Sequence, residues 1–386
     1  MYTEYDKIKR IPITIKPDSR RIILRKFNLE QETILRIGRQ LNGYSIEQID
    51  AIHDHIMTKF SQRHRDFSGF LDSVYDELAS VYPQTKAFNY KTRQVYCSYF
   101  VCEYSIEAAA LFNPSMVLLP EKNDPDKTKF VLSLRAAGER HISSVEFMSG
   151  TLDHNGNIAL DPVGGLAEMP VVVRHEPGLS KVEFHPATRL DERVIFPVAP
   201  EEINGIEDVR LVRFEQDNRI TYYGTFTAYD GHHILSKIFK TSDFIKFDIH
   251  RLNGEAVNDK GMAIFPRKIN GQYAMISRQD GDNLRIMFSG DILNWRESTV
   301  IKRPQTPWEL VKTGNCGSPI ETPQGWLLLT HGVGPMREYV LGACLLDLNR
   351  PDKIIAELPC PLLAPDADER EGYVPNVLYT CGGVIH

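Results

Sequence analysis

Four stretches of this chain repeat one plan: a strand, a polar turn and a second strand. They read FVLSLRAAGERHISSVEFMSG from Phe130, YYGTFTAYDGHHILSKIFKTS from Tyr222, YAMISRQDGDNLRIMFSGD from Tyr273 and WLLLTHGVGPMREYVLGACLLD from Trp326. The last three begin 51 and 53 residues apart. A repeat of about fifty residues made of short strands has the length of a propeller blade. The pattern therefore favours a β-propeller over an irregular β-sandwich with coincidental spacing.

A second short element precedes each repeat, and a further copy closes the chain. These elements are Phe112-Asn113-Pro114-Ser115, Glu207-Asp208-Val209, Ala263-Ile264-Phe265-Pro266, Ser318-Pro319-Ile320 and Val374-Pro375-Asn376-Val377. Five copies predict five blades. Because the chain ends inside the fifth copy, we expect an earlier strand, within 96–110 or 11–27, to complete the last blade. Residues 151–200, rich in Pro and Gly, form an insertion.

The first 95 residues have a different pattern. Residues 11–27 are β-like, and Ser45 with Gln48 forms a capping box ahead of a helical run of isoleucines. Apolar residues at helical spacing predict a second helix over 67–78. The sequence thus predicts an all-β fold, a five-bladed propeller over residues 96–386 with the insertion at about 151–200. Residues 1–95 form an N-terminal β-run plus helical appendage.

Charge and cysteine content narrow the function classes. The net charge of −6 gives no basic field for nucleic acid or an anionic membrane, and no apolar run has the length of a membrane span. The six cysteines contain no CxxC pair, which argues against a zinc site and a disulfide framework. No metal or cofactor is expected. The N-terminus shows no secretory signal, so we expect a cytoplasmic protein, or a periplasmic one if a leader was removed.

Cationic and polar residues recur at one place in the repeats. Five positions after the first residue of each aligned segment stand Arg135, Thr227, Arg278 and His331. Inner strands of a propeller line its central channel, and converging cations repel one another unless an anion joins them. Lys260 and Lys312 are expected in the loops that enter the same two blades as Arg278 and His331. Together these four residues predict a site for phosphate or another small anion.

Two adjacent carboxylates, Glu207 and Asp208, precede the second repeat and are expected to reach the same channel. An acid that faces an anion site suits transfer of a glycosyl group to that anion, because a departing sugar oxygen needs a proton donor. Water needs a general base to attack, whereas phosphate is already nucleophilic. One carboxylate and a cation cluster therefore match the requirements of a glycoside phosphorylase.

At these residues the sequence resembles glycoside hydrolase family 130, the mannoside phosphorylases and β-mannosidases. The resemblance covers most of residues 105–386. It is carried by FNPS (112–115), FVLSLR (130–135), GIEDVR (205–210), YYGTFTAYDG (222–231), NDKGMAIFPRKINGQYAMISR (258–278), SGDILNW (289–295), GSPIETPQGWLLLTHGV (317–333), LGACLLDL (341–348) and EGYVPNVLYTCG (371–382). The family fold is a five-bladed β-propeller. The resemblance implies an inverting β-mannoside phosphorylase, which transfers a mannosyl group to inorganic phosphate and yields α-mannose 1-phosphate.

The resemblance also assigns roles to residues. The family's acid falls on Asp208 and is expected to act through a hydroxyl of the mannosyl ring. Substrate-binding positions fall on Asn113, Ser115 and Arg135, with Glu207 as an orienting partner, and phosphate-binding positions on Lys260, Arg278, Lys312 and His331. Two positions depart from the family pattern: Lys260 stands where the phosphorylases carry arginine, and Glu-Asp-Val-Arg stands where Glu-Asp-Pro-Arg is commoner. Lysine keeps the charge of arginine but lacks its bidentate fork.

Two alternatives remain open. A β-mannosidase on the same fold, acting for example on β-1,2-mannosides, needs a second carboxylate as base, for which Glu207 and Asp230 are candidates. A non-catalytic carbohydrate-binding propeller would use aromatic stacking by Tyr229, Tyr273, Trp295 or Trp326. The expected partner is an oligosaccharide, with no nucleic acid and no membrane, and the helical appendage offers a contact surface for a homo-oligomer.

Overall fold

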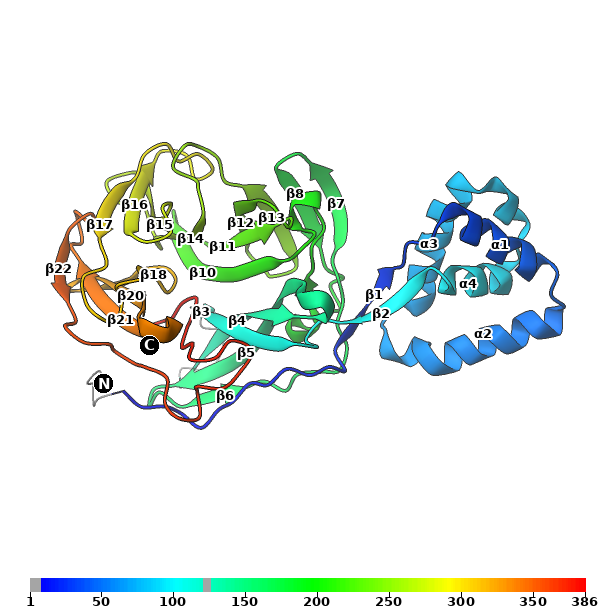
Figure 1. Cartoon of the computed structure of the whole chain (residues 1–386), viewed down its shortest axis with the longest axis horizontal. Helices are drawn as coiled ribbons and strands as arrows, with labels where there is room; N and C mark the ends of the chain where they lie inside the picture. Colours follow the sequence, from blue (N-terminus) through cyan, green and yellow to red (C-terminus); the bar gives the residue numbers. More distant parts are fainter. Residues whose placement is uncertain (1–7, 121–125) are drawn as a thin grey trace. The chain divides into compact units, whose positions relative to one another are not determined.

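The computed structural model describes residues 8–120 and 126–386, and the chain divides into two compact units. One unit comprises Asp18–Ala108 with Gly164–Glu168, and the other comprises residues up to Pro17, Ala109–Val163 and Met169–His386. The first is mainly helical, and the second consists of β-sheets arranged around a common centre (Figure 1). The fold is therefore mainly β and propeller-like, with N-terminal helices.

The helical unit contains four α-helices and one pair of strands. The helices are α1 (Gln31–Asn42), α2 (Ile46–Phe60), α3 (Phe67–Val81) and α4 (Tyr90–Ser98), with 3₁₀ turns η1 (Ser61–Arg63) and η2 (Pro83–Ala87). Ser45 caps α2, and its side chain accepts from the backbone of Gln48 while the Gln48 side chain accepts from Ser45, so the predicted capping box is confirmed. Leu71, Val74, Val95 and Tyr96 are buried between the helices and form much of this unit's core.

The helical unit extends beyond the boundary expected at residues 95–96. That boundary falls inside α4, whose Val95, Tyr96 and Cys97 are fully buried in the helical core. Strand β1 (Ile22–Lys26) pairs with β2 (Val101–Ser105) in antiparallel fashion. The expectation that a strand within 11–27 or 96–110 completes a blade is therefore wrong for these two strands, because they form a two-stranded sheet of their own within the helical unit.

Four sheets form the described part of the β unit, and each runs outward from the centre (Figure 1). The first contains β3 (Ala110–Leu118), β4 (Lys127–Ala137), β5 (Ser143–Asp153), β6 (Ile158–Leu160) and β9 (Val194–Ile195). The second contains β10 (Ile206–Gln216), β11 (Arg219–Tyr229), β12 (Ile234–Thr241), β13 (Lys246–Arg251), β8 (Leu179–Glu183) and β7 (Val171–Glu176). The third contains β14 (Lys260–Ile264), β15 (Tyr273–Arg278), β16 (Leu284–Ser289) and β17 (Thr299–Lys302). The fourth contains β18 (Lys312–Asn315), β19 (Ile320–Thr322), β20 (Gly325–Val333), β21 (Tyr339–Leu346) and β22 (Ile354–Glu357).

The four sequence repeats correspond to the second and third strands of these sheets, β4–β5, β11–β12, β15–β16 and β20–β21. The insertion supplies β7 and β8, which extend the second sheet at its outer edge, and β6 and β9, which pair with β5. The fifth copy forms no named strand, and Val377 makes only an isolated parallel bridge to Tyr339.

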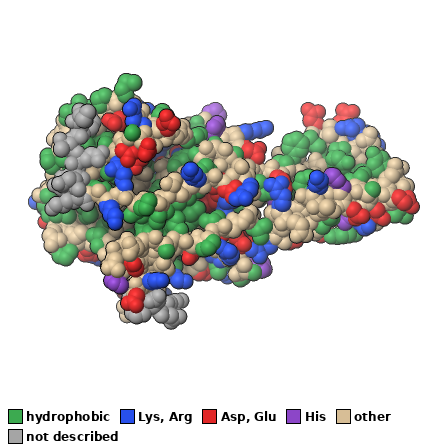
Figure 2. Space-filling model, turned by 90° about the horizontal axis from the view of Figure 1, so that it is seen from below, with side chains coloured by type: hydrophobic (Ala, Val, Ile, Leu, Met, Phe, Trp, Pro, Cys, Tyr) green, Lys and Arg blue, Asp and Glu red, His purple; other side chains and the backbone are tan. Residues whose placement is uncertain are grey.

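Apolar side chains fill the spaces between neighbouring sheets. Phe147, Phe226, Phe239 and Phe247 are buried between the first two sheets, and Trp326 meets Phe265 edge to face between the last two. Burial of such side chains is worth roughly 1.5–3 kcal/mol each, so the contacts between sheets hold the inner strands in place. On the face shown in Figure 2, acidic and basic side chains are interspersed. No helix among the described residues is long and apolar enough to cross a membrane.

Candidate active site

The first strand of three neighbouring sheets carries a β-bulge at the same place. The register shifts directly after Phe112 in β3, Glu207 in β10 and Lys260 in β14. The residues that follow have positive φ angles of 54°, 55° and 91°, and they are Asn113, Asp208 and Gly261. A bulge leaves its extra residue outside the ladder, and Asn and Asp tolerate the left-handed region better than most residues. The backbone therefore lifts Asn113 and Asp208 out of their ladders.

The residue before each bulge lies opposite one of the equivalent positions that the alignment of the four sequence repeats had identified. Phe112 lies opposite Arg135, Glu207 opposite Thr227 and Lys260 opposite Arg278. In the fourth sheet, Gly314 lies opposite His331. The repeat alignment thus located equivalent places on four sheets.

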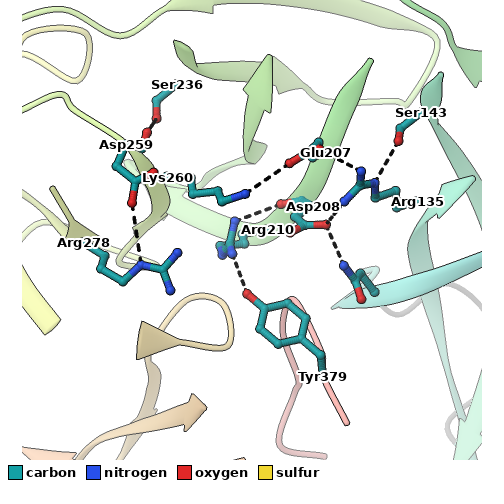
Figure 3. Close-up of polar contacts among 11 residues, drawn as sticks. Arg135, Ser143, Glu207, Asp208, Arg210, Ser236, Asp259, Lys260, Arg278 and Tyr379 are labelled. Atoms are coloured by element: carbon teal, nitrogen blue, oxygen red, sulfur yellow. Dashed lines mark hydrogen bonds and ion pairs between the residues drawn. The ribbon is translucent and has the colours of Figure 1, made fainter. Parts of the chain in front are cut away.

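Asp208 is held by groups from the neighbouring sheet (Figure 3). Its Oδ1 accepts a 2.6 Å hydrogen bond from Nδ2 of Asn113 and lies 3.3 Å from Nη1 of Arg135. Both contacts use Oδ1, and Oδ2 makes no hydrogen bond to any described residue. Burial by itself raises the pKa of Asp208. The charges of Arg135 and Arg210 and the hydrogen bond from the Asn113 amide lower this pKa by a larger amount, so the net pKa is below its ordinary value. Asp208 is therefore a carboxylate in the free protein at neutral pH.

Close approach of the first two sheets makes this contact possible. Arg135 donates from Nε to Oγ of Ser143, 2.9 Å away, and Ser143 bridges to Gly205 at the start of β10. Gly205 has a φ of 121°, and a Cβ there would lie 2.7 Å from the backbone nitrogen of Ser143. Only glycine fits this position, and it brings the Asp208 bulge beside β4.

Glu207 contacts cations on both of the neighbouring sheets, Arg135 on the first sheet and Lys260 on the third. One carboxylate oxygen accepts from Nη2 of Arg135 at 2.8 Å, and the other lies 3.5 Å from Nζ of Lys260 (Figure 3). The predicted binding residue thus occupies a position between the Asp208 centre and the third sheet. Because both neighbours are cations, Glu207 orients them.

Arg278, His331 and Lys312 bring the third and fourth sheets together. Nη1 of Arg278 lies 3.2 Å from Nε2 of His331. Nε of Arg278 has no hydrogen-bond partner among the described residues but lies 3.9 Å from Oδ2 of Asp259 (Figure 3). Burial and the charges of Arg278, Arg210 and Lys312 hold the pKa of His331 well below its ordinary value. His331 is therefore neutral and accepts from Arg278, which leaves other N–H donors of Arg278 for an anion.

Gly314, on the adjacent strand, leaves room for the side chains of Arg278 and His331. A Cβ at Gly314 would lie 2.5 Å from Cε1 of His331 and 3.1 Å from Nη1 of Arg278. Lys312 begins the same strand, β18, and its charge acts on His331. Lys260 begins β14 in the same way, so the expectation that the two lysines lie in loops is wrong. The predicted phosphate-binding residues therefore share one region, with His331 as a neutral partner and not as a further cation.

Two predicted residues lie away from the open part of the site. Ser115 is fully buried, and its Oγ accepts a 2.9 Å hydrogen bond from the backbone of Leu211, which ties β3 to β10. Asp230 lies in the β11–β12 turn and accepts from the backbones of His232 and His233, which lowers its pKa. A carboxylate that is held in a turn by backbone hydrogen bonds is a poor candidate for the general base of a hydrolase.

Residues from the C-terminal segment complete the site, and sequence reasoning missed them. Tyr379 accepts a 2.8 Å hydrogen bond from Nη2 of the buried Arg210, and its ring meets that of His331 edge to face. Tyr373 stacks on Phe112. Two stretches of the sequence pointed to this segment, the fifth copy of the repeat element and the motif EGYVPNVLYTCG, but neither assigned a role to Tyr373 or Tyr379.

The sheets and the carboxylate–cation centre define a propeller-like protein whose inner strands carry two adjacent carboxylates, Glu207 and Asp208, beside a group of cations. No described group of His, Cys, Asp and Glu residues has the geometry of a metal site. Residues 182–386, more than half of the chain, match the profile of glycoside hydrolase family 130, described as beta-1,4-mannooligosaccharide phosphorylase. The chain belongs to this family, which confirms the resemblance seen in the sequence.

The relatives to which this chain is similar are named as phosphorylases. It is 34% identical over 199 residues to a 1,2-β-oligomannan phosphorylase and 37% identical over 200 residues to a β-1,2-mannobiose phosphorylase, both from a Thermoanaerobacter species. Each alignment covers 51% of this chain, and they cover 66% and 65% of the relatives, so less than two thirds of either relative is matched. The solved β-1,2-mannobiose phosphorylase of Listeria innocua is similar in fold, with a TM-score of 0.51, 19% identity and coverage of 73% of this chain and 84% of that one.

Proposed function

We propose that this chain is an inverting β-mannoside phosphorylase. The observation that carries the proposal is that the Asp208 carboxylate on β10 and the Arg278 guanidinium on β15 belong to one site, with Lys260 between them (Figure 3). The phosphorylase names of the relatives support it. The substrate class is a β-mannoside, and β-1,2-mannobiose is the first to test.

The reaction balances without any further reagent. An oxygen of monohydrogen phosphate attacks the anomeric carbon of the mannosyl ring from the face opposite the leaving sugar. The bond from that carbon to the glycosidic oxygen breaks, and the configuration inverts from β to α. The proton of the phosphate balances the proton that the leaving sugar takes up, so the products are α-mannose 1-phosphate and a free sugar hydroxyl.

Phosphate binding prepares Asp208 for its role. In the free protein, cations hold the pKa of Asp208 low, and Lys260 is one of them. A phosphate dianion beside Lys260 and Arg278 offsets part of this positive charge, which raises the tendency of Asp208 to take a proton. Asp208 then delivers that proton to the glycosidic oxygen through a hydroxyl of the mannosyl ring, the route implied by the family.

The other residues have supporting roles in this proposal. Asn113 and Arg135 hold the mannosyl ring and the acid, Glu207 orients Arg135 and Lys260, and Lys260, Arg278 and Lys312 bind phosphate. His331 orients Arg278. Ser115 acts through the backbone of Leu211 and has a positioning role.

We infer that the ring has five blades and that the last one is irregular. Residues 8–17 belong to the β unit although they form no strand, and Arg10 binds the carboxylate of Glu369 at 3.0 Å. Ile15 and Val384 pack against the same core of the first sheet. These contacts support an arrangement in which the two ends of the chain fill the place of a fifth sheet.

Product analysis tests the proposal. Purified protein is incubated with β-1,2-mannobiose or β-1,4-mannobiose, with and without inorganic phosphate, and products are followed by ³¹P NMR and sugar analysis. We expect α-mannose 1-phosphate only when phosphate is present. Release of free mannose at equal rates without phosphate would indicate the β-mannosidase, and binding without turnover would indicate a non-catalytic propeller.

A further inference from the structure

An aromatic platform lies beside the Asp208 centre. The ring of Tyr373 stacks on that of Phe112, with centroids 5.7 Å apart and an interplanar angle of 17°. The Tyr373 hydroxyl lies 2.9 Å from Nδ1 of His141. The side chains come from three segments: the C-terminal segment, β3 and the turn between β4 and β5.

The platform is held in place before any ligand binds. Asn376 closes the loop that carries Tyr373, because its backbone donates to Arg370 O at 3.0 Å and its side chain accepts from Nε of Arg370 at 3.0 Å. The carbonyl of Asn376 in turn accepts from the backbone of Tyr339 in β21. Tyr373 is still 48% exposed. A fixed tyrosine with one face on Phe112 and much of its surface open is suited to bind the apolar face of a sugar ring.

The position of the platform fits the leaving sugar. Phe112 precedes Asn113, which binds Asp208, and the guanidinium of Arg135 lies 5.2 Å from the centre of the Phe112 ring. Two of the cations proposed for phosphate, Lys260 on β14 and Arg278 on β15, lie on the other side of Asp208 from Arg135 (Figure 3). Because inversion places the nucleophile and the leaving group on opposite faces of the mannosyl ring, the side of Arg135 and Phe112 is the side of the leaving sugar.

We propose that Tyr373, supported by Phe112 and His141, binds the sugar that leaves in phosphorolysis and that acts as acceptor in the reverse reaction. This inference rests on the proposed function and adds to it the residue that selects the second sugar. The ring of Tyr373 takes the apolar face of that sugar, and His141 presents a ring nitrogen to its hydroxyl groups. Tyr373 is a binding residue in this scheme and takes no part in proton transfer.

The reverse reaction separates this role from a general structural one. Wild type, Tyr373→Ala, Tyr373→Phe and His141→Ala are assayed with α-mannose 1-phosphate and free mannose as acceptor, with each KM measured separately. We expect Tyr373→Ala to raise the acceptor KM by about tenfold, the order of one aromatic contact, and to leave the KM of α-mannose 1-phosphate within about twofold. Tyr373→Phe keeps the ring and should stay close to wild type.

Tyr44→Ala is the matched control, because Tyr44 is exposed to a similar extent, 45%, but lies in the helical unit. Thermal unfolding checks that each variant folds. If wild type is active and Tyr373→Ala keeps its acceptor KM, or raises both KM values equally, this inference is wrong while the proposed function stands. If wild type forms no glycosidic product and no mannose 1-phosphate in either direction, the proposed function fails and this inference fails with it.

Discussion

Asn113 and Asp208 occupy the same bulge position in neighbouring sheets, and the amide of the first donates a 2.6 Å hydrogen bond to the carboxylate of the second. Their φ angles are 54° and 55°. Non-glycine residues held in this region mark positions where the surrounding structure enforces an unfavourable backbone. One repeated distortion of the strand thus supplies both the proposed acid and the group that orients it.

Replacement of Asp208 by asparagine tests the acid directly. Asparagine tolerates the left-handed backbone, so Asp208→Asn should fold and still bind mannosides. We expect phosphorolysis of β-1,2-mannobiose to fall by about 10²–10⁴-fold, the usual contribution of a general acid. The measurement is the rate of α-mannose 1-phosphate release, with ligand binding by calorimetry as the control. More than a tenth of wild-type turnover in the variant would exclude Asp208 as the proton donor.

Replacement of Asn113 tests how the pKa of Asp208 is set. The Asn113 amide stabilises the ionised carboxylate and thereby lowers its pKa. Asn113→Gly, which accepts the positive φ without strain, should therefore shift the limb of the pH profile of kcat/KM that reports Asp208 to higher pH. Asn113→Ala should show the same shift and also lose roughly 1 kcal/mol of stability from backbone strain. An unchanged profile in both variants would contradict this role of Asn113.

Lys260 offers a test of the anion site. Lys260→Ala should raise the KM for phosphate by at least about tenfold, since a charge-assisted contact to phosphate is worth roughly 1.5–3 kcal/mol, with a smaller effect on the KM for the mannoside. Lys260→Arg adds a fork of donors and should lower the phosphate KM below that of wild type. The control is Lys246→Ala, which removes an exposed lysine paired with Glu183 on the outer part of the second sheet. Equal KM values for phosphate in Lys260→Ala and wild type would place the anion elsewhere.

Acid should destabilise the fold through His331. This histidine is 3% exposed, and its pKa in the folded chain lies well below the value near 6.5 of the unfolded chain. Above pH 6.5 His331 is neutral in both the folded and the unfolded chain and does not change the stability. Below pH 6.5 the free energy of unfolding decreases, because the unfolded chain takes up the proton first. Between pH 7.5 and 5.5, the free energy of unfolding of wild type should fall more than that of His331→Gln. The difference is at most about 1.4 kcal/mol for each pH unit below 6.5. Parallel curves from chemical denaturation at several pH values would show that His331 is not the group responsible.

Much of the fold could be predicted from local pattern. The strand–turn–strand repeats identified β4–β5, β11–β12, β15–β16 and β20–β21, because alternation of apolar residues and turn residues are local signals. The capping box of Ser45 was predicted for the same reason. The pairing of β1 with β2 was not, since it joins residues about eighty positions apart and no local pattern records which distant strand meets which.

The site was predicted in part. Counting residues in the repeats placed Arg135, Arg278 and His331 at equivalent positions, and the register of the sheets agrees with that count. The neutral state of His331 depends on burial and on three nearby cations, and neither is visible in a linear sequence. The burial of Ser115 against Leu211 depends in the same way on how two sheets meet.

The sequence by itself determined the strand–turn–strand repeats, the helix capped by Ser45, the helix over 67–78 and the membership of the family, because these depend on residue type and spacing along the chain. Only the tertiary structure decided that Asn113 faces Asp208 and that Tyr373 and Tyr379 join the site from the C-terminal segment. The physical reason is that the packing of one sheet on the next sets the distances between their inner strands, and those distances determine which charged groups share a site.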